Sequence, residues 1–351
     1  MKKLHLALVS LGVMLLAAGC GGGGGGGGIP TAAVKITTTN ATDVAKSANT
    51  SAQGMAKSGA GMAGFVGVVA QSSGPSRSVL DISLAQFARV RGLQLAPSGG
   101  VVGVISGFPM TYNCATGAAV TSGAPNTMTM DIQDKNNNAT IDSGDVLVMS
   151  FSSCNEGTST MNGGMTFTMT TLNGALGGTG TPSAPLKAAF TLSFNNLSNK
   201  DNATGATDMI NGDITFSTSD DGTNIKGTMS GTSLSMTSSV DGAFQMSSYN
   251  ISFTEADYPT ASTPYSFTFN MTTASVVAGG SITITTTTPF TGVGTGNPIA
   301  GVMVITGANN STLILTALSD GQHVHLVVDD DGAAGPDAPV AITPDTTWAA
   351  L

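Results

Sequence analysis

The residues best suited to chemistry form one oxygen-rich loop, which begins at Asp134 and ends at Asp145. The candidate ligands are the oxygen-bearing residues Asp134, Asn136, Asn138, Thr140, Asp142 and Asp145. Calcium binds several oxygen ligands at once, and a short loop with oxygens at this spacing can wrap around a single ion. The loop is therefore a candidate calcium site.

This segment resembles the calcium loop of EF-hand proteins and, more closely, that of dockerins. The resemblance implies that Thr140 contributes its backbone carbonyl, that Ile141 is the apolar anchor and that calcium is bound weakly, as in extracellular modules. Ala139 stands where the family has a glycine for the sharp turn, and the flanking residues alternate like strands rather than helices. The alternative interpretation is a polar hairpin loop that binds no ion.

The N-terminus is organised as an export signal. Lys2 and Lys3 supply the positive charge, and the apolar run Leu4–Ala18 is shorter than the roughly 20 residues of a membrane-spanning helix. The sequence Leu16-Ala17-Ala18-Gly19-Cys20 resembles the lipobox of bacterial lipoprotein precursors. The resemblance implies that residues 1–19 are removed as a signal peptide and that Cys20 is acylated, for example with palmitate.

Gly21 follows that cysteine where lipoproteins of the Gram-negative inner membrane carry an aspartate, so the resemblance implies the outer membrane and a lipid bilayer as partner. The alternative is an ordinary cleaved signal peptide with an incidental cysteine. Gly21–Gly28 is an uninterrupted glycine tract, which is typical of a flexible coil. We expect residues 20–41 to form a tether between the bilayer and a folded body.

Two further cysteines, Cys114 and Cys154, frame the oxygen-rich loop and the alternating segments beside it. Outside the cytoplasm a disulfide is the expected state of such a pair. Closing a loop of this size corresponds to roughly 4 kcal/mol of stabilisation in the chain-entropy model. The alternative is two free, buried thiols.

Residues 42–100 are expected to form helices that pack on a sheet. Thr42-Asp43 could cap a first helix with Val44, Ala48, Ala52 and Met55 on one face, and Ser78–Arg91 has the clearest helical periodicity.

From residue 101 to 351 apolar side chains recur at every second position, which predicts strands with one apolar and one Ser/Thr face. The pattern is carried by Met165, Phe167, Met169, Phe190, Leu192, Phe194, Ile214, Phe216, Leu234, Met236, Ile251, Phe253, Phe267, Phe269, Met271, Ile282, Ile284, Val324, Leu326 and Val328. Turn signals such as Asp221-Gly222, Gly279-Gly280 and Asp320-Gly321 separate these segments. The expected fold is mainly β, of the α+β class. Its strands are expected to form one large antiparallel meander, and this sheet is expected to be strongly curved or to form a sandwich-like or barrel-like body.

Composition excludes several classes of function. The net charge is −9 and only 9% of residues are charged, so a nucleic-acid footprint is not expected. His323 and His325 lie two apart and could share a metal only with a third ligand, and we expect them on a solvated face. Asp329-Asp330-Asp331-Gly332 resembles a degenerate calcium repeat but fits a solvated strand end better. No motif indicates an enzyme.

The expected protein is therefore an outer-membrane lipoprotein whose β-rich body has a structural, adhesive or binding role without catalysis. One alternative is a carrier that holds a lipid or hydrophobic ligand in a curved sheet. A second alternative is a hydrolase with a site assembled from distant residues, which would require a buried acid near His323 or His325.

Overall fold

A computed structural model describes residues 30–49, 51, 109–115, 120, 125–136, 142–174, 180–239, 242–256, 262–294, 296–332 and 339–351. These residues contain one antiparallel sheet of fourteen strands, in which each strand is hydrogen-bonded to the next strand of the chain. The strands are β1 (Met110–Asn113), β2 (Thr127–Gln133), β3 (Val146–Asn155), β4 (Ser159–Asn173), β5 (Leu186–Asp201), β6 (Thr207–Asp220), β7 (Asn224–Ser238), β8 (Gly242–Ala256), β9 (Pro264–Ser275), β10 (Gly280–Val293), β11 (Ala300–Thr306), β12 (Thr312–Ala317), β13 (His323–Asp329) and β14 (Val340–Thr347). The expected meander and the mainly β class are confirmed.

Contacts group the chain into two compact units. The first unit comprises Ala56–Ala243 and Ser247–Asn250, and so contains β1–β7. The second unit comprises Met1–Met55, Phe244–Met246 and Ile251–Leu351, and contains β9–β14. All fourteen strands lie in the expected β domain of residues 101–351, but the residues of β8 are shared between the two units.

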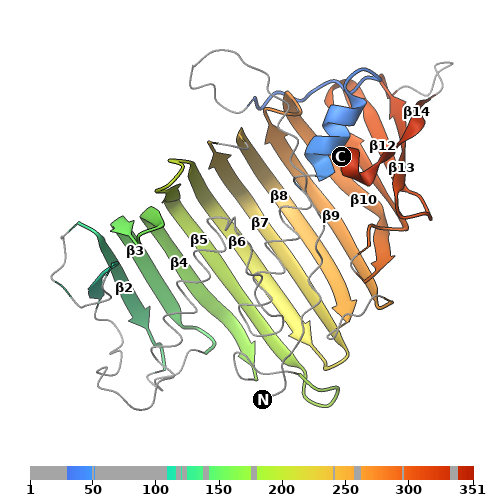
Figure 1. Ribbon diagram of the computed structural model, residues 1–351. Helices are drawn as coiled ribbons and strands as arrows, with labels where there is room; N and C mark the ends of the chain where they lie inside the picture. The colour runs from blue at the N-terminus through green and yellow to red at the C-terminus, as the bar shows by residue number, and fades with distance from the viewer. Residues whose placement is uncertain are drawn as a thin grey trace. The chain divides into compact units, whose positions relative to one another are not determined.

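In the first unit the two-residue period places one set of side chains in the interior. Cross-strand pairing aligns Phe190 of β5 with Met169 of β4 and Phe216 of β6. The ring of Phe190 lies 5.0 Å from that of Phe167 and 5.3 Å from that of Phe216, measured between centroids. These side chains are fully buried, and each buried phenylalanine contributes roughly 1.5–3 kcal/mol. The opposite face carries threonine and serine. Figure 1 shows β2–β7 lying side by side in this order.

Bulges interrupt the strands of the first unit in a regular way. Ser153 in β3 and Asn196 in β5 both have φ of +47°. The backbone amide of each donates a hydrogen bond to the side chain of an asparagine on the next strand. The Ser153 amide donates to Oδ1 of Asn162 at 2.8 Å, and the Asn196 amide donates to Oδ1 of Asn211 at 3.1 Å. A glycine with positive φ, Gly163 or Gly212, follows each of those asparagines.

The β3–β4 and β5–β6 hairpins are therefore two copies of one structural unit. The sequence carries the same repeat, Met161-Asn-Gly-Gly-Met-Thr-Phe in β4 and Ile210-Asn-Gly-Asp-Ile-Thr-Phe in β6. Sequence analysis did not identify this repeat. The asparagine of the repeat accepts a hydrogen bond from the backbone amide of the bulged residue. The glycine of the repeat adopts a positive φ and lacks a Cβ, which would clash with the neighbouring strand.

Among its described residues the second unit contains one α-helix, formed by residues 41–49 and 51, and two short 3-10 helices, η1 (Ala308–Asn310) and η2 (Trp348–Ala350). Ala41, Val44, Ala45 and Ala48 have no exposed surface. Two residues of the predicted stripe, Val44 and Ala48, are thus buried, whereas Ala52 and Met55 lie outside the described residues. The helix begins one residue before the predicted cap, since the Asn40 carbonyl accepts the first helical hydrogen bond from the Val44 amide at 3.0 Å. The predicted helix at Ser78–Arg91 lies outside the described residues.

The tether prediction was wrong for its last residues. Residues 32–41 are fixed to the second unit rather than free, and Ile36 is completely buried. The sequence signal for this docking is the alternation of Val34 and Ile36, whose apolar side chains favour a packed extended segment over a coil.

Candidate functional site

The predicted calcium loop joins β2 to β3 in the first unit. Asp145, with 3% of its surface exposed, accepts the Lys135 amide on Oδ1 at 2.9 Å and the Asp142 amide on Oδ2 at 2.8 Å. Its carboxylate therefore fastens the two ends of the loop together. Asn136 directs its Nδ2 amide, 2.9 Å from both carboxylate oxygens, toward Asp142.

This arrangement differs from a calcium-binding loop, because the side chain of Asn136 presents a donor to Asp142 rather than an oxygen ligand. Rotation of that amide by half a turn would supply the oxygen. Asn138 and Thr140 lie outside the described residues. Within the described part of the chain no three His, Cys, Asp or Glu side chains gather closely enough to hold a metal ion.

The predicted disulfide between Cys114 and Cys154 is confirmed. The two Cα atoms are 5.3 Å apart, and the bridge links the end of β1 to β3 across the start of β2. Asn126 stands beside it. Its carbonyl accepts the Cys114 amide at 3.0 Å, and its side chain accepts the Asn155 amide at 2.7 Å. The covalent link and these hydrogen bonds fix the edge of the first unit.

His323 and His325 point away from the core of the second unit, each paired with its own carboxylate. His323 Nδ1 lies 2.6 Å from Asp320, and His325 Nδ1 lies 2.7 Å from Asp345. The hydrogen bond from His323, together with backbone amides, lowers the pKa of Asp320 to about 2. Both imidazoles are more than one third exposed. The two pairs resemble surface ion pairs rather than the buried acid and base of a hydrolase.

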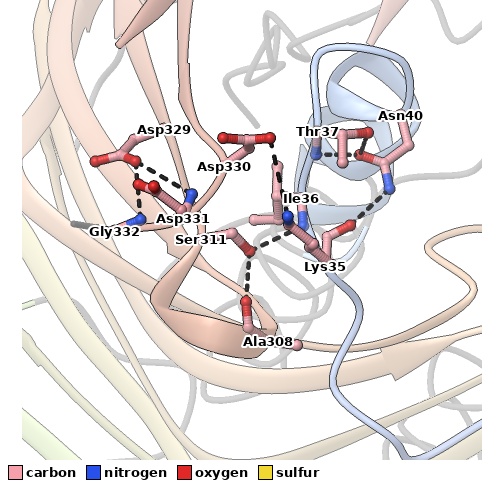
Figure 2. Close-up of polar contacts among 10 residues, drawn as sticks. All are labelled: Lys35, Ile36, Thr37, Asn40, Ala308, Ser311, Asp329, Asp330, Asp331 and Gly332. Carbon is pink, nitrogen blue, oxygen red and sulfur yellow. Dashed lines mark hydrogen bonds and ion pairs between the residues drawn. The ribbon is translucent and has the colours of Figure 1, made fainter. Parts of the chain in front are cut away.

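The N-terminal segment packs against the start of β10 and the turn between β11 and β12 in the second unit. Figure 2 shows its contacts with that turn. The Ile36 amide donates to Oγ of Ser311 at 2.9 Å, and that hydroxyl donates in turn to the Ala308 carbonyl at 2.8 Å. Lys35 reaches the Asp330 carboxylate at 3.9 Å. Asn40 accepts the Thr37 amide at 2.8 Å and so sets the turn into the helix.

The acidic run beside this segment is a folded turn. Oδ1 of Asp329 accepts the Gly332 amide at 2.9 Å, and Gly332 has a φ of +62°. Figure 2 shows Asp329 directed back to its own backbone while Asp330 faces the N-terminal segment. The run therefore ends β13 and pairs with Lys35, as expected for a solvated strand end. The Lys35–Asp330 pair was not predicted from the sequence, because its members lie 295 positions apart in the chain.

A shallow depression of about 340 Å³ lies on the Ser/Thr face of the first unit. It is lined by Thr171, Lys187, Ala188, Ala189, Ser217, Thr218, Ser219, Lys226, Gly227 and Thr228. Cross-strand pairing places Ser219 between Lys187 and Lys226, so the two lysines stand two strands or roughly 10 Å apart. Small side chains form the floor, which leaves both ammonium groups open to solvent. This site was not predicted from the sequence, because its two lysines come together only through the register of the three strands β5, β6 and β7.

No helix among the described residues is long and apolar enough to cross a membrane. The chain matches no known protein family, no curated protein and no solved structure at a significant level. Functional interpretation therefore rests on the residues themselves.

Proposed function

We propose that the protein is a lipid-anchored component of the bacterial outer membrane, whose β body has a structural, adhesive or binding role without catalysis. The observation that carries the proposal is the order of segments at the N-terminus. Two lysines, an apolar run, a lipobox-like pentapeptide ending at Cys20 and eight glycines precede the folded body. The Cys114–Cys154 disulfide supports export, because such bonds persist outside the reducing cytoplasm.

Metabolic labelling with a palmitate analogue tests the anchor in a Gram-negative host. The wild-type chain should incorporate the label and fractionate with the outer membrane, whereas Cys20→Ala should incorporate none. The double variant Cys114→Ser/Cys154→Ser is the matched control and should remain labelled, since it alters the other two cysteines. Absence of label on the wild-type chain would contradict the anchor.

The binding part of the proposal is favoured by the depression between Lys187 and Lys226. Two ammonium groups flanked by the hydroxyls of Ser217, Ser219 and Thr228 suit a polar, anionic ligand such as a sulfated or carboxylated glycan. The shallowness of the depression argues against the carrier alternative at this place, because a lipid tail lying there would remain largely exposed to solvent.

Dextran sulfate and neutral dextran are suitable probes for this site. The protein should retain dextran sulfate at low salt and lose it in Lys187→Gln/Lys226→Gln, while Lys200→Gln, which removes an exposed lysine elsewhere on β5, should bind as the parent does. Equal binding by all three proteins would exclude the depression as an anion site.

A further inference from the structure

The hairpin tip between β9 and β10 carries two exposed valines. Val276 and Val277 are 57% and 56% exposed, the highest values among the large apolar side chains of the described residues. Turns normally carry polar residues, so a pair of solvated valines at a tip is unusual.

The tip is a well-formed turn and not a frayed end. The Gly279 amide donates to the Val276 carbonyl at 3.1 Å, and the Ala278 amide donates to Oγ of Ser275 at 3.0 Å. That hydroxyl also lies 2.7 Å from Oγ of Ser47 on the buried face of the helix. The turn therefore holds the two valines in a fixed position.

The N-terminal segment joins the body directly beside this tip. The Ser281 amide donates to the Ala32 carbonyl at 2.9 Å, and the Val34 amide donates to the Ser281 carbonyl at 3.1 Å. Gly280 permits the approach, because a Cβ at this position would clash with the Ala32 carbonyl oxygen. Ala32 is thus hydrogen-bonded to Ser281, which follows Val277 by four positions in the chain.

If the protein is anchored to a membrane through Cys20, this placement limits the distance between the tip and the membrane. Eleven residues, 21–31, separate Cys20 from Ala32. A glycine-rich coil of that length has a root-mean-square reach of about 18 Å, and its fully extended length is about 40 Å. The proposed anchor would therefore hold the end of the second unit that carries Val276 and Val277 within about 40 Å of the bilayer.

We propose that Val276 and Val277 insert into the headgroup region of the bilayer and orient the anchored body. The proposal rests on the lipid anchor proposed above and adds a second contact to it. Two valines are too small to hold the protein alone, but an anchor that confines the tip near the surface makes their insertion intramolecular.

The surrounding charge indicates which bilayer fits. Asp329, Asp330 and Asp331 lie next to the same N-terminal segment (Figure 2), so an anionic surface would repel this end of the second unit. A zwitterionic surface removes that repulsion and leaves the apolar contact. Vesicles of phosphatidylcholine and phosphatidylethanolamine are therefore the appropriate probe.

The test couples the full mature chain, residues 20–351, through the Cys20 thiol to a maleimide lipid in such vesicles. The other two cysteines are bonded to each other and do not react. Val277→Trp places a fluorophore at the tip, and Val293→Trp is the matched control. Val293 is also exposed, at 42%, and ends β10 at its other end, roughly 45 Å from Gly280. The native Trp348 is only 8% exposed and gives a constant background.

Nitroxide-labelled lipids should quench Val277→Trp and leave Val293→Trp unchanged. Equal quenching of the two variants, or quenching of neither, would overturn the proposed contact. The outcome is independent of acylation in the cell, since the coupling is chemical. Absence of palmitate labelling would contradict the proposed lipid anchor, whereas absence of quenching would contradict only the proposed contact of the tip with the bilayer.

Discussion

At the residue scale, Asp145 shows how one buried carboxylate can organise a loop. The spacing of oxygens from Asp134 to Asp145 predicted an ion site, and the structure uses Asp145 to bind backbone amides at both ends of the loop. Spacing alone could not reveal this, because the same carboxylate can accept from amides or from calcium. The direction of the Asn136 amide was equally beyond a sequence argument.

Asp145→Ala should therefore destabilise the protein without calcium being involved. It leaves the amides of Lys135 and Asp142 without their acceptor, which should lower the free energy of unfolding by about 2 kcal/mol. Urea denaturation in a chelator measures the loss. If the loop also binds calcium, millimolar calcium should raise the melting temperature of the parent, and Asp134→Ala should abolish that rise. A parent that does not respond to calcium would leave only the structural role of Asp145.

Glu255 provides a second residue-scale prediction, this time on pH. Burial raises the pKa of Glu255 above its ordinary value of 4.5. A raised pKa means that the fold favours the protonated carboxyl, so its contribution to stability is complete below pH 4.5 and is lost as pH rises through the folded pKa. Glu255→Gln should therefore be more stable than the parent at pH 8 and nearly equal to it at pH 4.

Denaturation at those two pH values measures the effect. The matched control is Glu156→Gln, which changes the only other glutamate of the chain, in the β3–β4 turn. A pH-independent difference between Glu255→Gln and the parent would contradict the burial argument.

At the scale of elements, periodicity predicted the strands well. Phe190 and Phe216 were expected on an apolar face, and they are buried in contact with each other. The bulges were not predicted, because a residue such as Asn196 with positive φ interrupts the alternation that identifies a strand. Gly212 illustrates the missed signal, since the same Asn-Gly pair in β4 and β6 marks the duplicated hairpin.

Gly212→Ala should test whether the bulge requires glycine. Gly212 has a φ of +120°, and a Cβ there would clash with the Ser233 carbonyl oxygen on β7. Gly205→Ala is the matched control, with φ of +76° and nothing within 4 Å of the added Cβ. The control should lose only the roughly 1–2 kcal/mol of left-handed strain, measured by urea denaturation. Gly212→Ala should lose clearly more, and equal losses would mean that the sheet adjusts freely.

At the scale of the whole molecule, the disulfide relates the stability of the protein to the redox state of the compartment in which it folds. The pairing of Cys114 with Cys154 was predicted from the sequence and is confirmed, and export of the chain remains a proposal, whereas the docking of residues 32–41 was missed. That docking depends on Ser311 and Asp330, which are distant in the chain. Local patterns predict which residues face a core, but not which remote segments meet there.

The stability of the chain should therefore depend on where it is made. Closing a loop of 40 residues contributes roughly 4 kcal/mol, a large share of the 5–15 kcal/mol typical of a folded domain. A chain lacking residues 1–19 and kept in the reducing cytoplasm should carry free thiols and unfold at lower urea than the exported chain. In Cys114→Ser/Cys154→Ser the two preparations should unfold alike, because the variant has no bond to lose. A cytoplasmic chain as stable as the exported one would show that folding of the first unit does not depend on the bridge.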